Sequence, residues 1–259
     1  MSYPSKGCAQ FVFGNTGLLH LPTAEMQKDK TFMFGGAWLA EQALPDSHYG
    51  WDRDGTFNYF LNITFFPWLE INYTCTLIRG KYLAEFRGLN PNDFDYWANQ
   101  DRHFDFRVRA WKEGWWKPWT PQIVVGINDF LHTFGDSKFG TTDSGNGFWS
   151  RMFVAATKHE RIESVGELGL HVAYMHNNRA DFLYDGFGGG VNLRLNELKT
   201  NSEIINKVLS GLNLIIEYDS RTVNAGASYS FCKDIISVVF EMNEMKHFSA
   251  GVYCKLHLK

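Results

Sequence analysis

Hydrophobic residues recur at every second position along much of this chain, and they never form a long unbroken run. The longest run of apolar residues has five members, Met152 to Ala156. A transmembrane helix needs about 20 consecutive apolar residues, so the sequence predicts no such helix. Strict alternation instead marks β-strands with one apolar and one polar face. The last segment shows it over eleven positions, with Phe248, Ala250, Val252, Cys254, Leu256 and Leu258 on one face.

The alternation predicts twelve strands in one all-β domain, with very short helices at most. The turns at Pro67 and at Ser220-Arg221 are tight, whereas residues 80–102 and 133–145 read as longer polar loops. Short turns alternating with long loops favour an antiparallel up-and-down barrel. We expect residues 1–30 to form an N-terminal tail and a pre-barrel or plug segment, and residues 31–259 to form the barrel. The predicted strands lie near 31–40, 56–66, 68–78, 103–113, 121–131, 147–158, 164–175, 182–196, 211–219, 222–232, 234–242 and 247–258, and the best helical candidates are 92–100 and 202–210.

Period two alone does not say which face points inward. A soluble sandwich or lipocalin-like barrel buries its apolar face, whereas an outer-membrane barrel turns that face to lipid. Many predicted strands reach the roughly 9–11 residues of a transmembrane strand. Aromatic residues, 16% of the chain, also gather at strand ends, as in the girdles of membrane barrels. These features favour a transmembrane β-barrel of about 12 strands; the aromatic residues concerned are Phe65, Phe66, Trp68, Trp111, Trp115, Trp116 and Trp119.

Charge and cysteine content exclude several other classes. With 25 Lys and Arg against 28 Asp and Glu, the net charge of −3 does not suit a nucleic-acid partner. Cys8, Cys75, Cys232 and Cys254 form no CxxC pair and no zinc-type spacing, so we expect neither a metal nor a cofactor. Residues 1–10 lack the basic and apolar regions of a complete signal peptide, which predicts an absent or truncated signal.

The polar face of the predicted strands carries charges of both signs. Two interpretations are open: a lumen patch that contacts a glycan, or an ion-pair network that fills a narrow barrel, with Glu217 or Glu167 as partners of the residues near Asp105. Because unpaired buried charges are costly, the paired network is the default. The candidate residues are Asp105, Arg107, Arg109, Glu167, His171, Arg194, Glu217 and Lys255.

Five short motifs follow one another along the chain. They contain Gly17 with Pro22, Thr23 and Ala24; Pro67 with Trp68; Asp105, Arg107 and Arg109; Asp129; and Glu217, Tyr218 and Asp219. In this order the motifs resemble those of the YjbH-type family of bacterial envelope proteins. The resemblance implies an outer-membrane β-barrel tied to the export or assembly of exopolysaccharide or another envelope polysaccharide. It also implies outer-membrane lipid, polysaccharide and other envelope export proteins as partners, and the bacterial outer membrane as location.

Two other functions stay open beside a non-enzymatic export role. One is an outer-membrane hydrolase with its site at the rim, since His171 and His257 face the predicted lumen and Ser150, Ser228 and Ser230 are available. No Gly-x-Ser-x-Gly elbow is present, so we expect no enzyme. The other is a soluble barrel that binds a small ligand. The GFGGG run at residues 186–190 is not a phosphate loop and predicts a bend or a close approach in a strand.

Overall fold

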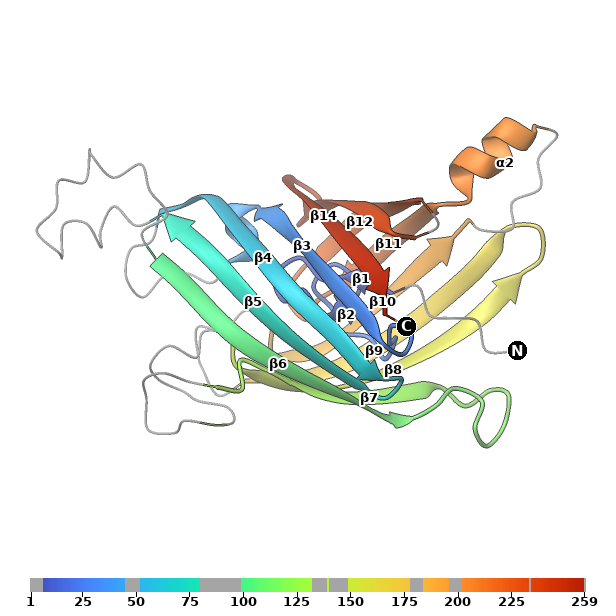
Figure 1. The fold of residues 1–259 in the computed structure, drawn as a ribbon, viewed down its shortest axis with the longest axis horizontal. Coiled ribbons are helices and arrows are strands. Elements are labelled where there is room, and N and C mark those ends of the chain that lie inside the picture. The colour runs from blue at the N-terminus through green and yellow to red at the C-terminus, as the bar shows by residue number, and fades with distance from the viewer. Residues whose placement is uncertain are drawn as a thin grey trace, which may run out of the picture.

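A computed structural model shows a closed barrel of twelve antiparallel strands (Figure 1), which confirms the predicted fold class. It describes residues 7–44, 52–79, 99–131, 139, 149–177, 184–195, 202–232 and 234–258. Neighbours along the chain pair in order, and β14 closes the barrel on β3. The barrel strands are β3 (Thr31–Leu39), β4 (Asp52–Phe66), β5 (Leu69–Arg79), β6 (Asn99–Trp111), β7 (Gln122–Asn128), β8 (Arg151–Ile162), β9 (Gly166–His176), β10 (Gly186–Arg194), β11 (Leu212–Tyr218), β12 (Val223–Phe231), β13 (Ile236–Asn243) and β14 (His247–His257).

The strand boundaries follow the alternation closely, with small differences at the ends. β4 and β6 begin about four residues earlier than predicted, and β7 ends at Asn128, because Asp129 takes a left-handed conformation with φ of 50°. The helical prediction for 202–210 is confirmed by α2 (Glu203–Leu209), where the Ser202 side chain accepts a hydrogen bond from the Ile205 N–H. The other helical candidate is 92–100. Its residues 92–98 lie outside the described residues, and residues 99 and 100 belong to β6 rather than to a helix.

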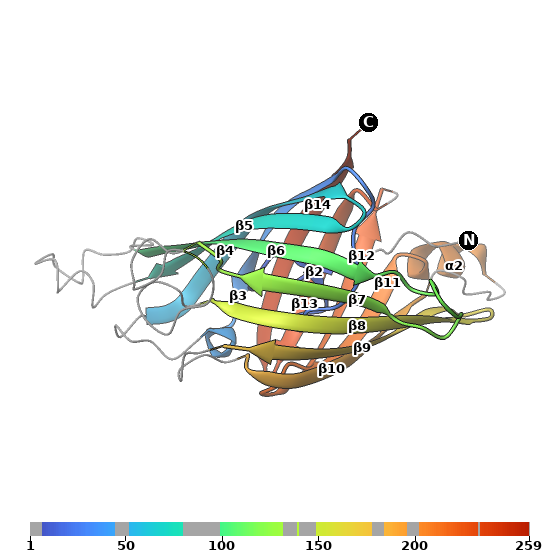
Figure 2. The ribbon, with the colours of Figure 1, turned by 90° about the horizontal axis from the view of Figure 1, so that it is seen from below.

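The two ends of the barrel differ. The end that carries α2, here called the helix end, also holds the β4–β5, β6–β7 and β8–β9 connections (Figures 1 and 2). The opposite end, here called the cap end, holds the 3-10 turn η1 (Glu41–Ala43) and Tyr184, whose hydroxyl donates to the Ala43 carbonyl at 3.0 Å. In the described part of the chain, no helix is both long and apolar enough to cross a membrane.

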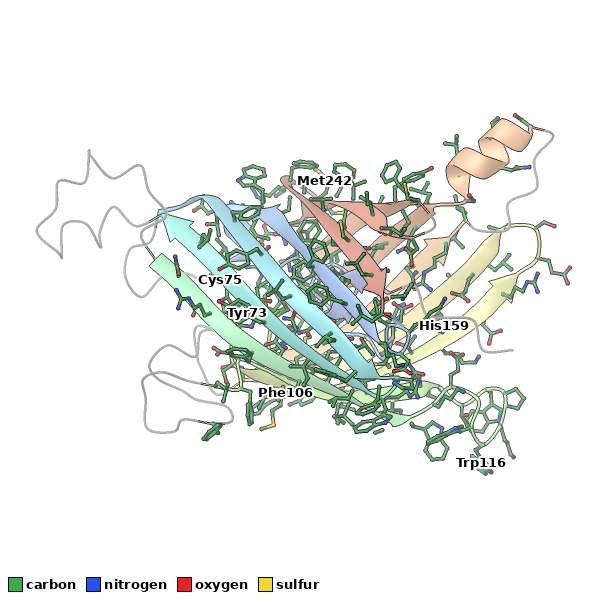
Figure 3. The ribbon with its side chains drawn as sticks, viewed as in Figure 1. Tyr73, Cys75, Phe106, Trp116, His159 and Met242 are labelled. Atoms are coloured by element: carbon green, nitrogen blue, oxygen red, sulfur yellow. The ribbon has the colours of Figure 1, made fainter. Side chains whose placement is uncertain are left out.

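The side chains are distributed inside out relative to a soluble protein. Outward residues such as Val172 and Ile216 are 61% and 56% exposed, and Met242 points away from the barrel in Figure 3. The inward residues of the same strands are buried, and they include the polar or charged side chains of His171, Asn213 and Glu217 beside the apolar Ala173, Met175 and Ile215. A lipocalin-like barrel would show the reverse, with its apolar face inside. The pattern is typical of a barrel whose outer wall meets an apolar medium.

Residues 7–27 lie inside the barrel, and every one of them is buried. This segment, here called the plug, contains a two-stranded sheet of β1 (Cys8–Ala9) and β2 (Thr16–Gly17), visible within the barrel in Figure 1. It begins and ends at one place, because the Gln27 side-chain amide donates to the Gly7 carbonyl at 3.0 Å. The plug is thus a folded loop that fills the lumen before the chain enters β3.

Glycine in β10 lets the wall approach the plug closely. A Cβ at Gly190 would lie 2.6 Å from Leu18 Cδ1, and a Cβ at Gly188 would lie 2.5 Å from Leu21 Cδ1. The neighbouring Gly189 has no such contact, since the nearest atom to its Cβ position is 3.5 Å away. The close approach expected for the GFGGG run is therefore an approach of the wall to the plug leucines.

Candidate functional site: a plugged, charged lumen

The plug is held near the cap end by one carboxylate that binds its backbone. The Glu217 carboxylate accepts hydrogen bonds from three successive N–H groups, those of Leu19 at 2.9 Å, His20 at 2.7 Å and Leu21 at 3.3 Å. Hydrogen bonds to a charged acceptor are stronger than neutral ones. Three of them on one side chain therefore fix the conformation of the plug at this point.

The His20 side chain adds a cation to the same acidic region. Its Nε2 lies 2.6 Å from Glu241 Oε1, and its ring stacks on Tyr184 with centroids 5.5 Å apart. Burial by itself would lower the pKa of His20, but the Glu241 carboxylate outweighs burial and raises the pKa to about 8. His20 is therefore a charged anchor of the plug at neutral pH.

Arginine side chains hold the plug toward the helix end. One Nη of Arg107 pairs with Glu70 at 2.7 Å, and the other donates to the carbonyls of Thr23 at 2.6 Å and Glu25 at 2.9 Å. All of these groups are buried. Arg107 thus joins the barrel wall to two plug carbonyls while its own charge is balanced by Glu70.

The Glu25 carboxylate is the anionic counterpart of His20. It forms a close ion pair with Arg194 and lies 3.1 Å from Nε2 of His159, which sits near the helix end in Figure 3. Burial alone would raise the pKa of Glu25, but Arg194 and His159 lower it well below its usual range. Arg194 is balanced on its other side by Glu167 at 2.7 Å.

The middle of the plug is held by amide and hydroxyl side chains of the wall. Asn72 Nδ2 and Thr74 Oγ1 donate to the Phe13 carbonyl at 2.6 and 2.7 Å. Asn58 donates to the Phe11 carbonyl, and Asn15 of the plug donates to Asp105 at 2.7 Å. The lumen wall therefore satisfies main-chain carbonyls with the same groups that bind sugar hydroxyls in other proteins.

The predicted charged patch is dispersed over the wall, and its partners differ from those expected. Asp105 and Arg107 do share one strand face, but Arg107 pairs with Glu70 rather than with Glu217 or Glu167. Glu217 binds plug backbone, Glu167 pairs with Arg194, and Lys255 donates to the Gly7 carbonyl at 3.1 Å. Glu70 and Glu167 lie directly opposite Arg107 and Arg194 on the neighbouring strands, which explains these two pairs. Glu217 and Lys255 instead bind the plug, which lies between the opposite walls. His171 is buried between Thr157 and Asn192, whereas Arg109 is only half-buried, next to a bulge in β6.

The residues of the family-like motifs lie in the plug and at turns. Gly17 pairs with Pro22 in an isolated bridge, Thr23 binds Arg107 through its carbonyl, and the Ala24 N–H donates to Thr157 at 2.9 Å. Pro67 and Trp68 form the β4–β5 turn. The Asp129 N–H donates to Asp105 at 2.9 Å, the Tyr218 hydroxyl donates to the Ser220 carbonyl at 2.9 Å, and Asp219 accepts from the N–H groups of Arg221 and Thr222 at 3.0 and 2.8 Å.

Sequence reasoning did not select His20, Glu25, His159 or Arg151 as site residues. His20 and Glu25 stand before the first alternating strand, where no period assigns a side chain to a face. They could have been found from their charge, since a charged side chain of a plug inside a closed lumen needs a partner of opposite charge on the wall. His159 and Arg151 do lie on β8, but partners from distant strands and from the plug define their roles.

The two histidines considered for hydrolysis do not meet a serine. His171 hydrogen-bonds to Thr157 Oγ1 at 2.9 Å and to Asn192 Oδ1 at 2.8 Å, and His257 hydrogen-bonds to Thr31 Oγ1 at 2.9 Å. Among the described residues, no group of three or more His, Cys, Asp or Glu side chains is arranged to hold a metal ion. The contacts of the lumen side chains Glu217 and Arg107 serve to hold the plug.

Comparison with known proteins agrees with the resemblance seen in the sequence. Residues 9–180 match the family YjbH, described as "Exopolysaccharide biosynthesis protein YbjH". The "Uncharacterized lipoprotein YjbH" of Escherichia coli (strain K12) is 31% identical over 158 residues, which are 61% of this chain and 18% of that protein's length. A mutant porin of Rh. blastica covers 78% of this chain and 56% of its own at 12% identity, with a TM-score of 0.30, from which we infer nothing. On the family match, which includes the plug and strands β3 to β9, this chain belongs to the YjbH family of exopolysaccharide-related proteins.

Proposed function

We propose that this chain is a bacterial outer-membrane β-barrel that takes part in the export or assembly of exopolysaccharide or another envelope polysaccharide, without catalysing a reaction. The observation that carries the proposal is the inside-out wall, with apolar side chains outside and a polar, charged lumen closed by a plug. Such a wall is stable where its outer face meets lipid and its inner charges are paired.

The aromatic residues at the helix end support a membrane location. Trp115, Trp116 and Trp119 are 63–67% exposed in the β6–β7 connection, where Figure 3 shows Trp116 at the edge of the molecule. Phe66 and Trp68 are about half exposed in the neighbouring turn. Exposed Trp rings favour the boundary between lipid tails and water. The partner of this surface is then the lipid of the outer membrane.

The lumen supports a role with polysaccharide. Asn58, Asn72 and Thr74 hold plug carbonyls now and would offer the same donors to sugar hydroxyls if the plug moved. The described state has its lumen filled, so export through this barrel requires plug displacement. This chain spans 18% of the length of the E. coli relative. On the family resemblance, other envelope export proteins are further proposed partners.

Two measurements test the proposal. A detergent-purified barrel should migrate faster on a gel before heating than after it, since a closed barrel resists unfolding by detergent. Deletion of the gene should lower the amount of secreted or surface polysaccharide, and the gene carried in trans should restore it. A protein that is soluble without detergent, or a deletion strain with unchanged polysaccharide, would contradict the proposal.

A further inference from the structure

Arg151 is a fully buried cation that forms no ion pair with a carboxylate of the described residues. Its Nε donates to Asn128 Oδ1 at 2.8 Å, and Nη1 lies 3.2 Å from the sulfur of Met175. The guanidinium carbon lies 3.8 Å from the ring centroid of Phe13 in the plug. Within the described residues, Nη2 has no hydrogen-bond acceptor. The carboxylates of Asp105, Asp219 and Glu217 act on Arg151 electrostatically but form no direct ion pair with it. A buried charge without a direct ion pair is costly, so this arrangement calls for an explanation.

Two further nitrogen donors beside Arg151 also lack an acceptor among the described residues. Asn128 faces Arg151 across the β7–β8 pair, and its Oδ1 is used by Arg151, which leaves Nδ2 as the free donor. Trp149, directly before β8, is 1% exposed, and its Nε1 has no acceptor. Buried polar groups are nearly always paired in folded proteins. Three unpaired donors on adjoining residues therefore indicate a place built for an acceptor group.

The tip of the plug covers this donor cluster. The Phe13 ring lies 5.8 Å from the Trp149 ring and stacks over the Arg151 guanidinium, while Asn72 and Thr74 hold the Phe13 carbonyl. A cation over an aromatic face is stabilised, which offsets part of the cost of burying Arg151. Phe13 thus covers one face of the guanidinium, while the Nη2 edge, which a carboxylate would approach in the guanidinium plane, has no acceptor among the described residues.

We propose that Arg151, Asn128 and Trp149 form a carboxylate-binding subsite in the lumen, for an acidic sugar residue of a polysaccharide, and that Phe13 covers it while the plug is in place. Nη2 of the guanidinium can donate a charge-assisted hydrogen bond to a carboxylate, and the indole and amide N–H groups add two more donors. That the carboxylate belongs to a sugar rests on the proposed function. The donor set alone calls for an oxyanion.

The test uses the full chain in detergent, with its unfolding temperature followed by the heat-dependent gel shift. Sodium glucuronate is the probe, and glucose, sodium phosphate and sodium chloride at equal ionic strength are the comparisons. A ligand that binds only the folded state raises the unfolding temperature in a saturable way. We expect this rise with glucuronate alone, and at a lower glucuronate concentration in Phe13→Ala, where the ring no longer covers Arg151.

Three variants assign the effect to the subsite. Arg151→Gln should abolish the glucuronate response, and Trp149→Phe, which removes only the N–H, should weaken the affinity about tenfold. Arg102→Gln, at an exposed arginine of β6, is the matched control and should respond like the unaltered protein. If Arg151→Gln does not fold, the comparison of Phe13→Ala with the double variant Phe13→Ala, Trp149→Phe decides.

Three results would overturn the subsite: no saturable response in any form, an equal response to phosphate or chloride, or a response that survives both Arg151→Gln and Trp149→Phe. No response in any form would mean that water accepts the hydrogen bonds of these donors. An equal response to phosphate or chloride would mean an adventitious ion only. These outcomes are separate from the gene-deletion experiment. A barrel that binds glucuronate but whose loss leaves polysaccharide unchanged contradicts the proposed function and leaves the carboxylate subsite standing.

Discussion

The plug is held by opposite chemistry at its two halves. Near the cap end, the wall contributes carboxylates, Glu217 and Glu241, and the plug contributes N–H groups and the His20 cation. Near the helix end, the wall contributes the cations Arg107 and Arg194, and the plug contributes carbonyls and the Glu25 carboxylate. One wall carboxylate also binds plug backbone there, because Glu70 accepts the Thr16 N–H at 2.8 Å. The charges of the plug therefore complement the wall in one orientation only. Reversed insertion would place like charges together, so the pairing specifies how the plug sits.

Removing Arg107, at the helix end, should have the largest effect on the stability of the protein. Arg107→Met deletes the contacts to Thr23 and Glu25 and leaves the buried Glu70 carboxylate without its cation. Glu70 then keeps only the hydrogen bonds that its Oε1 accepts from the Thr16 N–H and from Asn62, both at 2.8 Å. We expect a loss of about 3–5 kcal/mol in the free energy of unfolding. Urea unfolding in detergent measures it, with Arg102→Met on the exposed face of the same strand as control. A loss no larger than that of the control would show that the helix-end contacts do not anchor the plug.

Weakening the cap-end carboxylate should have a smaller and more local effect. Glu217→Gln keeps the shape of the side chain but loses the charge and one of two acceptor oxygens. Hydrogen bonds to a charged group contribute about 1.5–3 kcal/mol each, and part of them survives on the remaining oxygen. We expect faster hydrogen exchange at the amides of Leu19, His20 and Leu21. Glu160→Gln, at an exposed position of β8, should leave that exchange unchanged; equal exchange in the two variants would contradict the assignment.

Substitution of two adjacent glycines in β10 distinguishes an effect on plug packing from an effect on the strand, because only Gly190 faces the plug. Gly190→Ala places a methyl group 2.6 Å from Leu18 Cδ1, so the leucine or the plug must shift, at a cost of about 1–3 kcal/mol. Gly189→Ala points outward and meets its nearest atom at 3.5 Å, so it should cost little. Ion conductance in planar bilayers tests the plug directly. Gly190→Ala should raise the frequency of openings relative to Gly189→Ala, and equal traces would show that Leu18 does not secure the plug.

A change of pH should affect the two halves of the plug differently, and this is the smallest of the expected effects. The pKa of His20 is raised to about 8, so its stabilising contribution is complete below about 6.5 and is lost as pH rises through 8. The pKa of Glu25 is lowered, so its contribution is present above about 4.5 and is lost only in acid. Between pH 7 and 9, the protection of amides against hydrogen exchange, taken relative to the intrinsic base-catalysed rate at each pH, should fall at residues 19–21 and stay unchanged at residues 23–25. His20→Gln should remove this difference.

The strands themselves could be predicted from the sequence, because side chains alternate between two faces at a fixed period. That rule places Asp105 and Arg107 on one face and places the final strand from Phe248 onward. The helix α2 was also expected within 202–210, and in the structure the Ser202 hydroxyl caps its first turn. The alternation does not predict which side chains in the lumen pair with one another, because these partners come from different parts of the chain. Arg107 meets Glu70 on the next strand, and Glu217 meets a backbone almost 200 residues earlier.

By itself, the sequence determined that the chain forms twelve strands with an apolar and a polar face, because alternation is a local property of each strand. It also carried the family resemblance, since motifs are read in order along the chain. Only the tertiary structure decided what fills the polar face. The plug carries no periodic pattern, and its position depends on contacts of Glu217, Arg107 and Arg194 that arise when the barrel closes. The unpaired donors around Arg151 likewise exist only after three strands and the plug tip come together.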